Sequence, residues 1–348
     1  MKPQKVILIN ISTKYSAIGR YTADIASSCS NSSIISLKLN NSISNNQFDG
    51  TIITGLGFPF ASGWVVNSIF QKQIYRAGIN SITSRDDNSY FLHYTSQGIV
   101  PLRTDFNDIV TIHDTFGTHK GEATMVESLV ANMFLRKYKR IRNILTVSNV
   151  VKSDLEDLGF DSNIKVIYPC VSAGFFTIEN KMALRKELNL PATSKLLLSV
   201  SSNLERKNLK ILPGILKELG NDYKLIRVGP RIMDDEINFA GINQETLNKI
   251  YNSADVLVNT SLAEGFGYPN VEAFSIGLPV VCSDIEVFRE IGGDAPIYVR
   301  NSKDSFVKGI KEAITNSKEL GTRGKMLSKK FSRERFENEI KQYYELNL

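Results

Sequence analysis

The sequence contains few of the residues on which disulfide-bonded and zinc-binding proteins depend. Its 348 residues include three cysteines and three histidines. Cys29, Cys170 and Cys282 have no Cys-x-x-Cys spacing, so we expect no structural zinc site and a reduced, cytoplasmic protein. No apolar run approaches the roughly 18 residues that a membrane-spanning helix needs. The first apolar run, residues 6–9, is too short for a secretory signal and is predicted to be the first strand.

The sequence does contain enough apolar residues for two domains. It is 42% hydrophobic and 22% charged, and a chain of this length can bury two cores. Apolar, β-branched runs alternate with helical patterns, which is typical of α/β domains with parallel sheets flanked by helices. The pattern breaks near residues 168–174, which predicts one domain over residues 1–171 and a second over residues 172–332. The predicted strands are residues 6–10, 33–37, 50–53, 90–93, 109–112, 144–147 and 166–167, then 196–200, 225–228, 256–258, 280–282 and 297–299.

Two glutamates, Glu264 and Glu272, enclose seven residues that include two glycines and a proline. Residues 255–259 are predicted as a buried strand before them, and residues 271–274 as part of a helix. A strand, a tight turn and a helix start form an anion site, because free N–H groups and the positive end of the helix meet there. Pro269 suits the first helical turn. Phosphate would repel the carboxylates, so we interpret them as ligands for hydroxyl groups on either side of a phosphate, as in a sugar nucleotide. The alternative is an ordinary strand-turn-helix crossover with a charged rim, since short glycine motifs recur by chance.

The following residues extend this pattern. Residues 275–283 end a helix at a glycine and enter a new buried strand, and a second acidic segment lies at residues 286–291. Taken together, residues 251–299 closely resemble the donor-binding half of retaining glycosyltransferases of the large family four, whose motif is Glu-x7-Glu. The resemblance implies a GT-B fold, in which two Rossmann-like domains face each other across a cleft. The N-terminal domain would bind the acceptor and the C-terminal domain the nucleotide sugar, and the last helix, here residues 333–348, would cross back to the N-terminal domain.

A basic segment after the first strand of the second domain resembles the same family. Arg206, Lys207 and Asn208 lead into a helix and resemble the family's phosphate-contact motif, although Ser201 stands where the family usually has glycine. Cations fixed there would stabilise the negative charge that develops on a leaving diphosphate. Without this context, an Arg-Lys pair is usually a solvated helix start.

The N-terminal domain carries two weaker resemblances. His113 ends a strand in the sequence Thr-Ile-His-Asp, which resembles a family segment whose histidine reaches the donor sugar. The alternative is a structural histidine, and the same choice applies to His93. Gly19 lies in a loop similar to the family's Gly-Ile-Gly-Arg-Tyr-Thr loop, with Ala17 in place of the first glycine, and a glycine there lets backbone approach a diphosphate. In the C-terminal domain, the resemblance places Asn243 in a segment that passes the nucleobase.

The resemblance implies a retaining, metal-independent hexosyltransferase without a cofactor. It would move a sugar from a UDP- or GDP-linked donor to an acceptor hydroxyl in glycan, polysaccharide or glycolipid assembly. Glu264 would hold the sugar hydroxyls, Glu272 the ribose hydroxyls, and the amides of Gly265, Phe266 and Gly267 would lie near sugar and phosphate. No carboxylate is evidently placed as a nucleophile, which favours front-side displacement. The alternatives are a sugar-nucleotide epimerase or phosphorylase, and a non-catalytic homologue that binds a partner or a glycan.

The net charge of +6 is mildly basic, and one segment concentrates it in Arg136, Lys137, Lys139, Arg140 and Arg142. No nucleic-acid motif accompanies these residues. The segment is either the solvated end of a helix, whose cations favour its C-terminus, or a peripheral contact with the cytoplasmic face of an anionic membrane.

Two further sets of residues are candidates for ligand contacts. The acidic clusters at residues 86–87 and 234–236 are interpreted as surface loops, so no metal is assigned. A set of apolar residues in the N-terminal domain is either a contact for an apolar or lipid-linked acceptor or part of a buried helix. These acceptor candidates are Phe60, Trp64, Val65, Phe70 and Tyr75.

Overall fold

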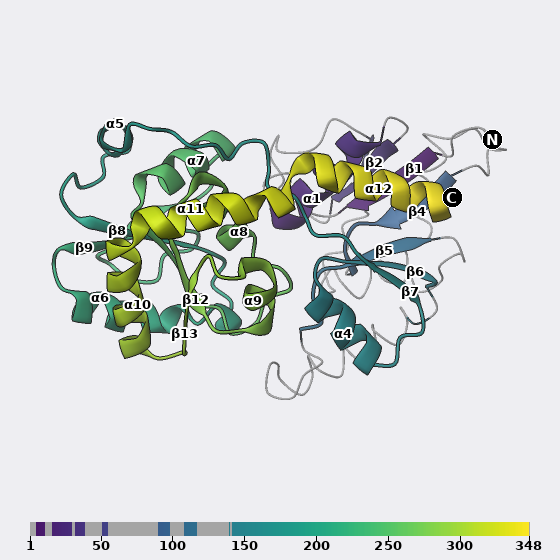
Figure 1. Cartoon of the computed structure of the whole chain (residues 1–348). Coiled ribbons are helices and arrows are strands. Elements are labelled where there is room, and N and C mark those ends of the chain that lie inside the picture. Colours follow the sequence, from purple (N-terminus) through teal and green to yellow (C-terminus); the bar gives the residue numbers. More distant parts are fainter. Residues whose placement is uncertain are drawn as a thin grey trace, which may run out of the picture. The chain divides into compact units, whose positions relative to one another are not determined.

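The computed structural model describes residues 5–10, 16–29, 32–38, 51–54, 90–97, 108–116, 139 and 141–347. The chain divides into two compact units, one of Met1–Cys170 with Glu334–Leu348 and one of Val171–Arg333. Each unit is built on a parallel sheet with accompanying helices (Figure 1). The prediction of an α/β protein with two parallel sheets is confirmed.

The first unit has a seven-stranded sheet in the order β3-β2-β1-β4-β5-β6-β7. The strand order reverses between β1 and β4, as in Rossmann-like sheets. Helix α1 (Ala17–Ser28) is capped by the side chain of Ser16, and α4 (Asn149–Asp157) by that of Ser148. The strands are β1 (Lys5–Asn10), β2 (Ser32–Lys38), β3 (Thr51–Thr54), β4 (Tyr90–Tyr94), β5 (Ile109–Ile112), β6 (Asn143–Thr146) and β7 (Asn163–Val166).

The last helix, α12 (Arg333–Asn347), packs on the first unit, as the GT-B resemblance predicted. Figure 1 shows it running beside α1. Its buried residues recur at helical spacing. Leu346, near the end of the helix, is exposed. The α12 residues that join a core cluster with residues of β1 and α1 are Phe336, Ile340, Tyr343 and Tyr344.

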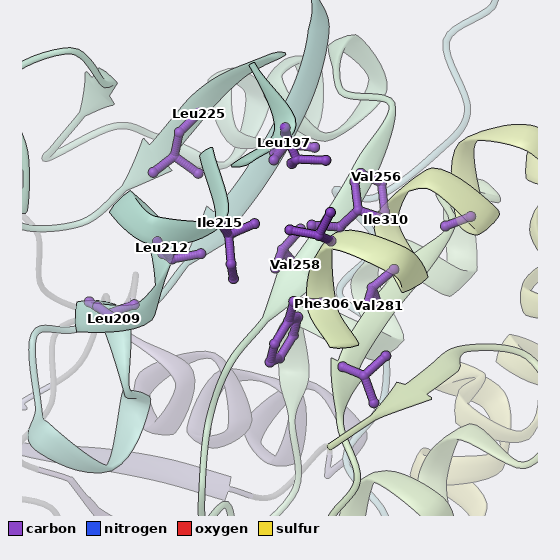
Figure 2. Close-up of a cluster of buried hydrophobic side chains, with 14 of the residues drawn as sticks. Leu197, Leu209, Leu212, Ile215, Leu225, Val256, Val258, Val281, Phe306 and Ile310 are labelled. Carbon is purple, nitrogen blue, oxygen red and sulfur yellow. The ribbon is translucent and has the colours of Figure 1, made fainter. Parts of the chain in front are cut away.

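The second unit has a six-stranded sheet in the order β10-β9-β8-β11-β12-β13. Helices α6 and α10 bury apolar side chains against β8, β9, β11 and β12, and Figure 2 shows Ile215 and Phe306 facing the strand residue Val258. The strands are β8 (Lys195–Val200), β9 (Tyr223–Val228), β10 (Ile237–Phe239), β11 (Val256–Asn259), β12 (Val280–Ser283) and β13 (Ile297–Val299). The helices are α5 (Lys181–Glu187), α6 (Leu212–Leu219), α7 (Gln244–Ser253), α8 (Tyr268–Ile276), α9 (Glu286–Gly292), α10 (Lys303–Thr315) and α11 (Ser317–Ser328).

Two strands differ from the prediction. β7 begins at Asn163, before the predicted residues 166–167, because exposed residues interrupt its apolar pattern. β10 was not predicted, since three residues with a central asparagine give no recognisable period. Within the described ranges, no helix is long and apolar enough to cross a membrane.

Candidate active site

The turn from β11 into α8 requires a glycine at its end. Gly267 has φ 106° and ψ 51°, and a Cβ built on it would lie 2.8 Å from a ring carbon of Phe288. Both the positive φ and the close ring exclude an ordinary side chain. Helix α8 then begins with Pro269 in its first turn. This proline lines a narrow recess together with residues from the carboxyl ends of β8 and β11, so the positive end of the α8 dipole lies at that recess.

Glu264 lies in this turn and is held by two cations from another segment. Its Oε2 is 3.3 Å from Nη1 of Arg206, and its Oε1 forms an ion pair with Nζ of Lys207. The hydroxyl of Ser261 donates a 2.7 Å hydrogen bond to the same Oε1. The side chains of Glu264, Lys207 and Arg206 are 11%, 13% and 26% exposed, so water reaches this cluster only in part. The structure therefore brings together three residues that the sequence singled out in two separate motifs.

Backbone hydrogen bonds fix the two cations beside the turn. Arg206 and Lys207 lie in a 3-10 segment, Glu205–Lys207, that follows β8. The N–H of Leu262 donates to the carbonyl of Arg206 at 2.7 Å, and Oγ1 of Thr260 donates to the carbonyl of Lys207 at 2.7 Å. Because β8 and β11 are neighbouring parallel strands, their following loops meet at one edge of the sheet.

Glu272, the second glutamate of the motif, has a different environment. It lies on α8 and is 3% exposed. The hydroxyl of Tyr251 on α7 donates a 2.6 Å hydrogen bond to its Oε2. Two residues before Glu272, Asn270 accepts a 2.8 Å hydrogen bond from the amide of Asn259, which ties α8 to β11. The two glutamates thus differ in their partners and in their exposure.

The other predicted donor contacts of the second unit are placed by packing and capping. Gly265 and Phe266 are buried, and the Phe266 ring packs edge-on against Tyr268 and Phe331, with centroid distances of 5.3 and 5.6 Å. The ring is used in packing, which leaves its backbone for ligand contacts. Asn243 is exposed and caps α7, because its Oδ1 accepts a 2.9 Å hydrogen bond from a backbone N–H of the first turn.

In the first unit, both Gly19 and His113 are held by local hydrogen bonds. Gly19 lies in the first turn of α1, and its N–H donates to Oγ of Ser16 at 3.0 Å. Nε2 of His113 donates to the carbonyl of Thr95 at 2.8 Å, and the ring of Tyr21 lies edge-on at 5.0 Å. Burial lowers the pKa of His113 to about 4. The imidazole is therefore neutral at pH 7, with Nδ1 as its acceptor atom.

His93 has the environment of a structural residue. Its Nδ1 is 2.6 Å from the hydroxyl of Tyr344 on α12, and its Nε2 is 2.8 Å from Oγ1 of Thr111. The side chain is fully buried, and burial lowers its pKa to about 3. Because both ring nitrogens have partners inside the core, the structural alternative for His93 is favoured.

Several predictions concern residues outside the described part of the chain. The acceptor candidates between residues 60 and 75 and the acidic pair at 86–87 all lie there, as does most of the basic segment at residues 136–142. Lys139 of that segment is described, and its Nζ lies 5.8 Å from the ring centroid of Phe160. Among the residues that are described, no three or more Cys, His, Asp or Glu side chains gather in a way that could hold a metal ion.

Comparison with known proteins identifies the second unit. Residues 180–330 match the family model described as Glycosyl transferases group 1. The match covers most of the second unit and less than half of the chain. The chain is also 28% identical over 243 residues to the O-antigen chain mannosyltransferase RfbU of Salmonella typhimurium. That alignment covers 65% of this chain and 64% of the relative, so the chain spans less than two thirds of the relative's length.

Solved structures extend the likeness to the whole length of the chain. Sucrose-phosphate synthase from Thermosynechococcus elongatus superimposes with a TM-score of 0.79 at 15% identity, covering 99% of both chains. HepE from Anabaena, in complex with UDP and glucose, gives a TM-score of 0.77 at 15% identity, covering 98% of this chain and 99% of HepE. At these identities the likeness establishes the fold, which is GT-B.

Two contact residues of the group 1 segment were missed by sequence reasoning. Ser261, which bonds Glu264, lies three residues before it and could have been noticed as a hydroxyl two residues after a strand. Tyr251, which bonds Glu272, lies on a separate helix 21 residues away. No local pattern encodes such a contact, because it depends on how α7 and α8 pack.

Proposed function

We propose that this chain is a retaining glycosyltransferase that moves a hexose-type sugar from a UDP- or GDP-linked donor to an acceptor hydroxyl. The observation that carries the proposal is the cluster in which Arg206 and Lys207 flank Glu264 beside the amino end of α8. Two cations next to a helix N-terminus suit a diphosphate, and the carboxylate between them suits hydroxyls of the attached sugar. The group 1 family match, the name of RfbU and the UDP bound to HepE support the same class of reaction.

In the proposed mechanism, the donor diphosphate takes Arg206 and Lys207 from Glu264. The released carboxylate then accepts hydrogen bonds from the sugar hydroxyls. As the bond between the anomeric carbon and the diphosphate oxygen breaks, its electron pair goes to that oxygen, and the two cations stabilise the growing charge. The acceptor oxygen bonds to the anomeric carbon on the face that the diphosphate leaves, and its proton passes to the leaving phosphate. This front-side course retains the anomeric configuration, and the side-chain cations supply the positive charge without a metal ion.

The remaining predicted roles belong to the same proposal. Glu272 would bind the ribose hydroxyls, and Asn243 would lie in the segment beside the nucleobase. In the first unit, Gly19 would approach the diphosphate. A neutral His113 can accept a hydrogen bond from a donor hydroxyl through Nδ1, but it supplies no positive charge.

We further propose an acceptor in polysaccharide or glycolipid assembly, with the basic segment at residues 136–142 contacting an anionic membrane. Sedimentation with vesicles of neutral lipid, with and without 30% anionic lipid, tests the membrane contact. We expect binding only to the anionic vesicles and its loss at high salt, because a polybasic contact is electrostatic. Equal recovery with both kinds of vesicle would argue against this contact.

The function itself is tested with separate UDP- and GDP-sugars in the presence of EDTA. We expect one donor class to raise the melting temperature and to release free nucleotide slowly. Once an acceptor is found, NMR should show that the sugar in the product has the same anomeric configuration as in the donor. If no UDP- or GDP-sugar raised the melting temperature or released nucleotide, the proposal would be contradicted. A glycosyl adduct trapped on a side chain would contradict the front-side course but leave the transferase intact.

A further inference from the structure

Arg227 lies near the carboxyl end of β9 and is fully buried. Its guanidinium reaches the neighbouring strand β8, where Ser199 is its register partner. Nη1 donates to the carbonyls of Ser199 at 3.0 Å and Val228 at 2.7 Å. Nη2 donates to the carbonyl of Ser201 and, at 3.2 Å, to its Oγ. One side chain therefore holds three carbonyl groups where β8 and β9 end.

Packing alone does not account for this arginine. In the part of the chain that the structure describes, no carboxylate lies within ion-pair distance of Arg227. The nearby Glu236 instead accepts hydrogen bonds from the N–H of Ile232 and the amide of Asn238. Burial lowers the pKa of Arg227 to about 10, while Glu236 acts in the opposite direction, so the guanidinium stays charged at pH 7. A buried cation without an ion pair is costly, and an apolar side chain of similar volume would fill the space without that cost.

Two of the three residues whose carbonyls Arg227 holds, Ser199 and Ser201, also line the recess at the candidate active site. Residues 199–201 line this recess together with Lys207 and Pro269. A carbonyl oxygen that faces an anion repels it, whereas a carbonyl bonded to the guanidinium has its negative end directed to that cation. The carbonyls of Ser199 and Ser201 therefore have their negative ends directed to the arginine.

Gly229, two residues after Arg227, shows how closely the backbone is fitted around this contact. It has φ 135°, and a Cβ built on it would lie 2.2 Å from the carbonyl oxygen of Ser201 and 3.0 Å from Nη2 of Arg227. The glycine thus makes room for both the carbonyl and the guanidinium that holds it.

We propose that Arg227 is a positioning residue for the donor diphosphate. It keeps the carbonyls of Ser199 and Ser201 turned away from the recess and holds a positive charge behind them. It acts through the end of β8 and does not touch the donor. The inference rests on the proposed function, because it concerns the same diphosphate site.

The test compares the binding of UDP, GDP, UMP and GMP to the wild type and to Arg227→Met by isothermal titration calorimetry. We expect the diphosphate that the wild type binds to lose about tenfold in affinity, which corresponds to about 1.4 kcal/mol. The monophosphate of the same nucleoside should lose less than about threefold, because it has one phosphate fewer to place. Arg227→Lys keeps the charge but not the planar fork, and should restore part of the preference for the diphosphate. If Arg227→Met does not fold, the lysine variant gives the same comparison.

Arg185→Met is the matched control. Arg185 is a second buried guanidinium in the same unit, which donates to three backbone carbonyls and forms a 2.7 Å ion pair with Asp255. Arg185 lies at the amino ends of the strands, opposite the candidate site, because its partner Asp255 directly precedes β11. We expect this variant to lower the melting temperature without changing the ratio of diphosphate to monophosphate affinity. An unchanged ratio in Arg227→Met and Arg227→Lys overturns the inference alone. A wild type that binds neither UDP nor GDP overturns the proposed function, and the inference with it.

Discussion

Replacing Glu264 by glutamine is expected to abolish sugar transfer and, at the same time, to strengthen the binding of free nucleoside diphosphate. In the structure, Glu264 forms ion pairs with both Arg206 and Lys207. A diphosphate has to take both cations from this carboxylate, whereas a neutral amide competes far less for them. Transfer should fail because the amide is a weaker acceptor for the sugar hydroxyls as the reaction proceeds.

The gain in diphosphate affinity can be worked out from the charges. A carboxylate roughly 6 Å from a phosphate charge repels it by about 2.8 kcal/mol at an effective dielectric constant of 20. The side chains of Glu264 and Arg206 are 11% and 26% exposed, so solvent screening reduces this energy. A remaining difference of about 1 kcal/mol corresponds to roughly fivefold tighter binding. A sugar-linked donor should gain less, because it loses hydroxyl contacts with the carboxylate.

Calorimetry with UDP and GDP measures this prediction, and a coupled nucleotide-release assay measures turnover. Glu312→Gln is the control, since Glu312 is an exposed residue of α10 and the substitution makes the same change in net charge. We expect the control to bind within about twofold of the wild type, because exposed charges are screened. Weaker diphosphate binding by Glu264→Gln would refute the reasoning, since Glu264 would then organise the two cations instead of competing for them.

Three other perturbations have definite expected outcomes. Tyr251→Phe removes a 2.6 Å hydrogen bond to a buried carboxylate and should lower the free energy of unfolding by about 1–3 kcal/mol, which urea unfolding measures. Gly267→Ala should cost roughly 2–4 kcal/mol because of its positive φ and the adjacent phenylalanine ring. Gly214→Ala on α6 should not lower the melting temperature, because the added Cβ would make only ordinary contact, at 3.5 Å, with the side chain of Lys303. His93 and His113 have folded pKa values of about 3 and about 4, below the unfolded value of about 6.5. The unfolded chain therefore binds more protons below pH 6.5, and stability should fall from pH 7 towards pH 4 by up to about 1.4 kcal/mol per pH unit for each histidine. Unfolding at several pH values checks this, and a His93→Gln variant with an unchanged slope would contradict it.

The fold could be predicted from the sequence because parallel strands covered on both faces are apolar at nearly every position. β11 and β12 are buried throughout, and their unbroken apolar runs identified them. β10 could not be found in this way, because three partly buried residues with a central asparagine give neither a run nor a period. Sequence pattern detects burial, and it fails where a strand at the edge of a sheet is only partly covered.

Less of the candidate site could be predicted, for a reason of the same kind. The turn at Gly267 needs a positive φ, which glycine adopts readily, and a proline suits the helix start that follows, so both residues mark the turn in the sequence. The pairing of Lys207 with Glu264 joins residues 57 positions apart, and it exists because β8 and β11 are neighbours in the sheet. The role of Arg227 was missed for the same reason, since its partners belong to the adjacent strand.

The competition between Glu264 and the diphosphate has a consequence for product release. In the proposed mechanism, the nucleoside diphosphate would still be bound to Arg206 and Lys207 after transfer, and the carboxylate would no longer hold a sugar. The ion pairs seen in the structure would then be the state to which these residues return when the product leaves. Their formation offsets part of the interaction energy that the departing diphosphate gives up, so it lowers the free energy needed for release. In this mechanism the same carboxylate would serve both donor recognition and product dissociation, and the tighter diphosphate binding expected for Glu264→Gln measures its contribution to dissociation.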